Sequence, residues 1–98
     1  MNRDSFWRPF APDALGLRSW DDELVVYNDV TGNTHHLSVL GRAVMTSLLS
    51  HPSGIALTAL ARGIADDAGT GADDELVEAV ERTLAHLAEL RLAAVVTA

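Results

Sequence analysis

The fold of this protein is decided by residues 23–49, which read ELVVYNDVTGNTHHLSVLGRAVMTSLL. Residues 23–28, at the start of this stretch, contain two Val and one Tyr, which favour a strand. The next four residues, DVTG, suit a tight turn because they include Asp and Gly. Residues 34–37 then form a second candidate strand, so the stretch begins as a β-hairpin.

The period of the sequence changes at Ser38, whose hydroxyl group can accept a hydrogen bond from a backbone N–H at the start of a helix. Apolar residues then recur at spacings of one, three and four, as on one face of an amphipathic helix over residues 39–49. The residues expected to face the core are Val39, Leu40, Ala43, Val44, Leu48 and Leu49. The sequence HPSG at residues 51–54 ends this helix.

Upstream of the hairpin, residues 17–20 form a third candidate strand, which an Asp-Asp turn joins to the hairpin. Residues 1–16 form an aromatic lead-in, in which Pro9 and Pro12 oppose a regular element. This lead-in either folds back onto the core, frays as a tail or occupies a binding groove of the domain. We therefore divide the chain into the lead-in, residues 1–16, and a domain of residues 17–98.

Two further helices and a short strand follow the first helix. Residues 57–68 predict the second helix, and the third begins at Asp73 or Asp74, where acidic residues complement the helix dipole. The core stripe of the third helix consists of Leu76, Val80, Leu84, Leu87 and Leu90 or Arg91. Residues 92–97 form a candidate final strand. The order of elements predicts an α+β, winged-helix-like fold, in which a three-stranded antiparallel meander precedes a three-helix bundle and a short C-terminal strand.

The length and composition describe one domain. The 98 residues are 48% hydrophobic and 21% charged, and they include no Cys that could form a disulfide. No apolar run approaches the ~20 residues that span a bilayer, and the N-terminus lacks the apolar segment of a signal peptide. We therefore expect a cytoplasmic protein.

The charge of the chain excludes some classes of partner. The chain has seven Arg, no Lys and fourteen acidic residues, for a net charge of −7. Residues 1–50 carry four Arg and six acidic residues, and residues 51–98 carry three Arg and eight acidic residues. Both halves therefore repel phosphate backbones and anionic lipids. We expect no nucleic-acid partner and no membrane partner, whereas a basic or extended peptide fits this charge.

The side chains that carry chemistry form no catalytic or metal-binding pattern. Adjacent His35 and His36 point to opposite faces of a strand and cannot share one metal ion, so we expect one to be packed and one exposed. The carboxylates cluster in turns and at helix ends, where capping and solubility explain them. The sequence TGNT at residues 31–34 has no Lys and no helix directly after it, unlike a phosphate loop. We expect no enzyme activity, no metal and no cofactor.

The predicted meander leaves one edge of its third strand unpaired. The free N–H and C=O groups of such an edge can receive an extended peptide as a further strand. If the third helix flanks this edge, the strand and the helix form a groove for apolar side chains of the peptide. The same edge could instead pair with a second copy of the chain and give a homodimer.

Two segments of the predicted meander resemble the PqqD family of small peptide chaperones, whose fold is the recognition element for precursors of ribosomally synthesised, modified peptides (RiPPs). The first segment is SWDDELVVYN at residues 19–28, and the second is TGNTHHL at residues 31–37. The resemblance continues through the helix of residues 39–49 and the leucine-rich last helix, and covers residues 17–96. The sequences WDDE and TGNTH are most similar to PqqD-like proteins that are associated with HPr-kinase-like enzymes.

The chain departs from this family pattern at two positions. Arg91 stands before the final Leu, where the family usually has Gly, and this change affects how the last helix ends. Ser38 stands where PqqD itself commonly has Asn, which exchanges one helix-capping residue for another.

The resemblance implies a non-catalytic peptide chaperone that binds the leader of a ribosomal precursor peptide by strand addition and presents it to a modifying enzyme. The implied strand positions are Asn33, Thr34, His35, His36 and Leu37. One flank of the third helix contributes Val77, Glu81, Leu84 and Ala88, and the other contributes Ala79, Thr83 and His86. We select the first flank because it joins apolar groups to one charge, although Val77 and Leu84 also suit the core.

Two other classes of function share these elements. One is an accessory or oligomerisation subunit of a kinase-like enzyme, which would have no peptide ligand and would co-purify with its enzyme. The other is a winged-helix nucleic-acid binder, which has the same number of elements. A recognition helix needs Arg or Lys toward the nucleic acid, whereas the third helix here is acidic.

Overall fold

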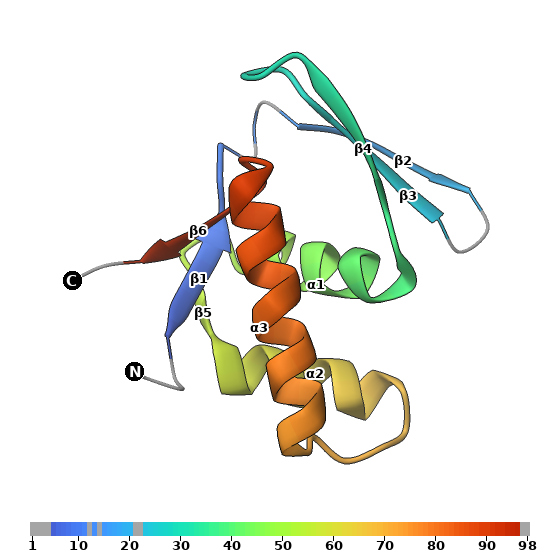
Figure 1. Ribbon diagram of the computed structural model, residues 1–98, viewed down its shortest axis with the longest axis vertical. Coiled ribbons are helices and arrows are strands. Elements are labelled where there is room, and N and C mark those ends of the chain that lie inside the picture. Colours follow the sequence, from blue (N-terminus) through green and yellow to red (C-terminus); the bar gives the residue numbers. More distant parts are fainter. Residues whose placement is uncertain (1–4, 12, 14, 21–22, 97–98) are drawn as a thin grey trace.

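A computed structural model describes residues 5–11, 13, 15–20 and 23–96. It has two small antiparallel sheets and three helices, which Figure 1 shows with the strands on two sides of the helical body. The elements are β1 (Phe6–Pro9), β2 (Leu15–Trp20), β3 (Glu23–Asn28), β4 (Asn33–Leu37), α1 (Val39–Leu49), β5 (Ile55–Ala56), α2 (Leu57–Asp67), α3 (Asp74–Glu89) and β6 (Ala93–Val96). The predicted α+β fold, with its antiparallel meander, three helices and C-terminal strand, is confirmed.

The meander is formed by β2, β3 and β4, in that order across the sheet. The turn between β3 and β4 is closed by a hydrogen bond of 2.7 Å from the Gly32 N–H to the Asn28 carbonyl oxygen. Gly32 has a positive φ of 78°, a conformation that glycine adopts without steric cost. Since Val26 pairs with His35 and Leu24 pairs with Leu37, these four side chains share the face that meets the helices.

The second sheet corrects one expectation for the lead-in. Pro9 was expected to oppose a regular element, but Phe6–Pro9 forms β1, which lies between β5 and β6. Pro9 is buried at the last position of the strand, where its missing N–H costs little, and Phe10 continues with a 3.1 Å hydrogen bond to the Leu92 carbonyl. This part of the lead-in therefore folds back onto the body and does not lie beside β4. The domain boundary after residue 16 stays a prediction.

The hydrophobic core lies where α1, α2 and α3 meet the inner face of the meander. Of the predicted stripe of α1, Val44 and Leu48 are buried, and Leu40 and Leu49 are partly buried against the core. Val39 was expected in the core, but it is 71% exposed. At about 100° per residue, Val39 points opposite to the buried side of α1, and Met45 occupies the core instead.

Candidate functional site

The third strand of the meander has a free edge. Within the described residues β4 pairs with β3 alone, so alternate residues of β4 direct their N–H and C=O groups away from the sheet. Chain continuity places α1 directly after this strand, since Ser38 is the single residue between them. The edge of β4 and the start of α1 therefore form one wall of the site.

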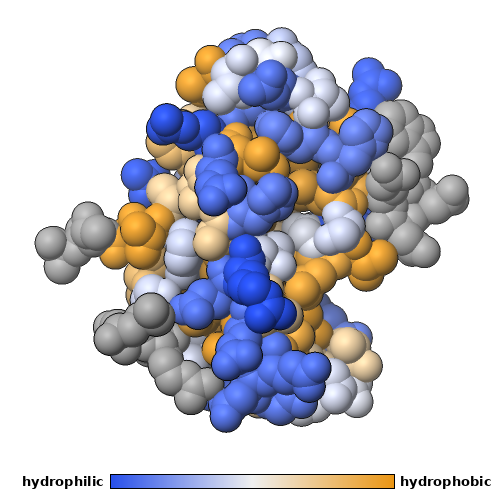
Figure 2. Space-filling view, in the orientation of Figure 1, coloured by the Kyte–Doolittle hydropathy of each residue, from blue (hydrophilic) through white to orange (hydrophobic). Residues whose placement is uncertain are grey.

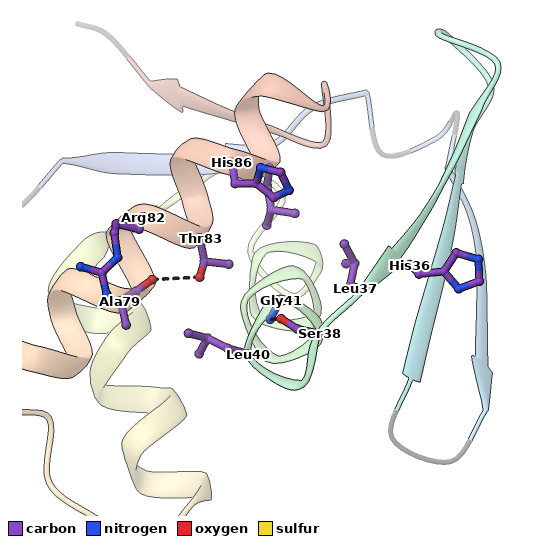
Figure 3. A pocket seen from close by; sticks show the side chains of 10 residues that line it. His36, Leu37, Ser38, Leu40, Gly41, Ala79, Arg82, Thr83 and His86 are labelled. Atoms are coloured by element: carbon purple, nitrogen blue, oxygen red, sulfur yellow. Dashed lines mark hydrogen bonds between the residues drawn. The ribbon is translucent and has the colours of Figure 1, made fainter.

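The opposite wall of the site is α3. Between β4, the start of α1 and α3 lies an open groove of about 410 Å³, a volume within the common range for ligand sites. The groove is lined by His36, Leu37, Ser38, Leu40, Gly41, Ala79, Arg82, Thr83, His86 and Leu87. Figure 3 shows Leu37 and His86 extending from the two walls toward the space between them.

The start of α1 can pack close to β4 because of two local features. The Ser38 hydroxyl accepts a 3.1 Å hydrogen bond from the Gly41 N–H, which caps the helix as predicted. A Cβ atom at Gly41 would lie 3.3 Å from both the Leu37 Cβ and the Ser38 Oγ, which is tighter than most such contacts, so the absence of a side chain favours the close approach of α1 to β4. Gly41 therefore sets the floor of the groove.

Small side chains on α3 leave the groove open. Ala79 and Thr83 lie one turn apart, and the Thr83 hydroxyl donates a 2.8 Å hydrogen bond to the Ala79 carbonyl. The Leu87 side chain is buried beside them and contributes apolar surface to the base of the groove. The groove thus has a strand edge on one side, small side chains of α3 on the other and an apolar base. This combination suits a peptide that adds to the sheet as a further strand.

A buried asparagine connects the two walls. The Asn28 side chain, at the end of β3, is 0% exposed. Its Nδ2 donates a 2.9 Å hydrogen bond to the Arg91 carbonyl oxygen, just after α3, and its Oδ1 accepts a 2.9 Å hydrogen bond from the Val30 N–H. This amide ties the β3–β4 hairpin to the end of α3 and so helps to fix the separation of β4 from α3.

Arg91 lies two residues after the end of α3, at a position where the PqqD family that the sequence resembles usually has Gly. Arg91 has a φ of +62°, the left-handed conformation that usually holds glycine after a helix. Its N–H donates to the Ala88 carbonyl, and the Leu92 N–H donates to the Leu87 carbonyl at 2.9 Å. The backbone turn that glycine would favour is therefore present here with an arginine, whose carbonyl accepts the bond from Asn28.

The five predicted strand positions all lie on β4, but their side chains face different ways. Leu37 is buried and lines the groove, whereas Asn33 and Thr34 are exposed. His36 is exposed, and Figure 3 shows its ring on the far side of β4 from α3. His35 is half-buried on the inner face, where its Nε2 is buried and has no hydrogen-bond partner. One packed and one exposed histidine were predicted, and this is confirmed.

The selected flank of α3 does not line the groove in this structure. Leu84 is 0% exposed in the core, Val77 packs against the core, and Glu81 and Ala88 lie on other sides of the helix. The groove is formed by the alternative flank, with Ala79, Thr83 and His86. The physical reason is that Val80, Leu84 and Leu87 direct one side of α3 into the core, and the side next to β4 then carries the smaller residues.

Five residues that line the groove were not among the predicted site residues of the strand or of either flank of the third helix. Ser38, Leu40 and Gly41 could have been found because they directly follow β4 in the chain. Arg82 could have been found because it lies about 40° from His86 on a helical wheel, and Leu87, which was assigned to the core stripe, lies about 40° from Thr83. Within the residues that the structure describes, no group of three His, Cys, Asp or Glu side chains could hold a metal ion. Among the described residues, no helix is long and apolar enough to cross a membrane.

Comparison with known proteins supports the fold. No protein-family model and no curated protein matches this chain. A solved structure described as TbiB1 in complex with the TbiA(beta) leader peptide matches with a TM-score of 0.67 and 22% sequence identity. The match covers 83% of this chain and 90% of that chain. This chain therefore shares the fold of TbiB1, a protein whose structure holds a leader peptide.

Proposed function

We propose that this protein is a PqqD-like, non-catalytic chaperone that binds the leader segment of a ribosomal precursor peptide along β4. The observation that carries the proposal is the free edge of β4, which faces α3 across an apolar-based groove. An extended peptide can pair its backbone with this edge and direct alternate side chains into the groove. The fold shared with TbiB1, which was captured with a leader peptide, supports the same use of this chain.

The proposal also includes a partner enzyme and a cellular compartment. The bound leader is presented to a peptide-modifying enzyme in the cytoplasm, and the resemblance of residues 19–28 and 31–37 to one PqqD-like subgroup points to an HPr-kinase-like enzyme. The contact residues on the strand are those of β4. On the helix we now propose Ala79, Thr83 and His86 in place of the first flank, because these residues line the groove.

The proposal is tested by filling the groove. The probe is a fluorescein-labelled synthetic leader from a short peptide encoded beside this protein's gene, and the readout is fluorescence anisotropy. Ala79→Trp places a large ring in the groove and should weaken binding about tenfold or more. Ala85→Trp makes the same substitution on an exposed position of α3 outside the groove, so its affinity should stay within about twofold of wild type.

The other functions predict different results. If both tryptophan variants bind as wild type does, the peptide does not use this groove. If the leader does not bind but the neighbouring enzyme forms a stable complex with the chain, the accessory-subunit function replaces the chaperone function. A homodimer through β4 would make peptide affinity fall as protein concentration rises, since both partners need the same edge.

A further inference from the structure

The groove differs in charge from the helix that forms one of its walls. The sequence of α3 contains five carboxylates and a single Arg, which is Arg82. Arg82 lines the groove, as does His86 one turn later, and none of the described lining residues is acidic. A chain with a net charge of −7 therefore places the one Arg of its acidic last helix at the groove.

Arg82 is available to a ligand. Its side chain is exposed, and within the described part of the chain it forms no hydrogen bond or ion pair, although Glu78 lies four residues earlier. Arg82 is one of the residues that line the groove, and Figure 3 shows its side chain extending from α3 on the side away from Leu37 and β4. A guanidinium group is always protonated and presents a planar set of donors that matches a carboxylate.

His86 is a weaker candidate for the same role. Its Nδ1 lies 4.0 Å from the Glu89 carboxylate. A carboxylate of a peptide would therefore compete with Glu89 for contact with this ring. Both side chains are well exposed. Arg82 is therefore the cation of the groove that can select a ligand by charge.

The geometry of an added strand decides which side chains of the peptide enter the groove together. Side chains on one face of a strand recur every two residues, about 6.6–6.8 Å apart. If a large apolar side chain enters the base beside Leu37 and Leu40, a side chain two positions away reaches the rim of the groove.

From these observations we infer that the groove selects peptides with an Asp or Glu two positions from a large apolar residue, and that Arg82 is the residue that reads the carboxylate. This inference rests on the proposed peptide-binding function and adds the chemical class of the peptide. The carboxylate accepts hydrogen bonds from the guanidinium group at the rim, while the apolar residue is buried at the base. The net charge of the protein alone favours a basic peptide, and the attraction between Arg82 and the carboxylate acts locally against the repulsion of an acidic one.

The test is a selection from a displayed library of random dodecapeptides against immobilised full-length protein. Wild type should enrich an acidic residue two positions from a large apolar residue, and Arg82→Glu should enrich Lys or Arg at that position instead. Selected peptides are then synthesised as Glu and Gln pairs. Arg82→Gln should weaken the Glu peptide about five- to tenfold and the Gln peptide less than about twofold. Arg62→Gln, an exposed position on α2 outside the groove, is the matched control.

Two results overturn the inference in different ways. Equal affinity of wild type for the Glu and Gln peptides, or an equal loss for both in Arg82→Gln, would show that the groove binds peptides without reading charge. The peptide-binding function would then stand without its acidic preference. Failure of wild type to enrich any peptide would overturn the binding function itself, and the inference with it.

Discussion

Replacement of Asn28 tests whether one buried amide holds the two walls of the groove in place. Asn28→Ala removes the hydrogen bond to the Arg91 carbonyl and the acceptor of the Val30 N–H, both at 2.9 Å. A hydrogen bond contributes about 0.5–1.5 kcal/mol net, and a buried group that loses its partner costs about 1–3 kcal/mol. Val30 is 60% exposed, so water can replace the lost acceptor there, and we expect a total loss of about 2–3 kcal/mol.

The assay is thermal and urea unfolding followed by circular dichroism. For a domain of this size, a loss of about 2–3 kcal/mol lowers Tm by roughly 10–20 °C. The matched control is Asn33→Ala, which replaces the asparagine opposite Asn28 in the hairpin. Because Asn33 is exposed, its replacement should change the free energy of unfolding by less than about 0.5 kcal/mol.

A second variant isolates the link between the hairpin and α3. Asn28→Asp keeps an oxygen for the Val30 N–H but presents an ionised oxygen, in place of a donor, to the Arg91 carbonyl. We expect it to destabilise the protein at neutral pH and to weaken peptide binding, because the end of β3 is released from α3. Stability of Asn28→Ala within about 0.5 kcal/mol of wild type would refute the structural role of this amide.

Four further sets of substitutions follow from local geometry. Arg91→Gly should raise the free energy of unfolding by about 0.5–1 kcal/mol in urea titrations, since φ at this position is +62°. Gly63→Ala should also stabilise, by about 0.5–1 kcal/mol, because the site lies inside α2 with no atom within 4 Å of an added Cβ. Gly54→Ala should destabilise and lower Tm, since φ is +118° and the new Cβ would lie 2.8 Å from an aromatic ring. His35→Leu should raise Tm, because it removes a buried nitrogen that has no partner, whereas His36→Leu on the exposed face should not.

The local pattern of the sequence predicted most elements of this fold. The change of period at Ser38 and the acidic start of α3 each depend on neighbours within four residues, and both caps form as expected. The Asp73 carboxylate accepts a 2.8 Å hydrogen bond from the Leu76 N–H at the start of α3. Such signals are local, so one sequence suffices to find them.

Long-range pairing was not predictable in the same way. Phe6 pairs with Val96 across almost the whole chain, and no local pattern marks Phe6–Pro9 as the centre of a sheet. The side of α3 that faces β4 is likewise set by how the helix packs in three dimensions. Leu84 fitted either the core or the groove by sequence, and only the packing of α3 assigns it to the core.

The measurement that tests the central claim most directly is an amide NMR titration of the full chain with the unlabelled leader peptide. The account predicts chemical-shift changes along β4 and along the side of α3 that carries Ala79, Thr83 and His86, with new protection of β4 amides from solvent exchange. Changes confined to β2, to β6 or to the α1–α2 surface would contradict strand addition at β4. The peptide site would then lie elsewhere on the fold.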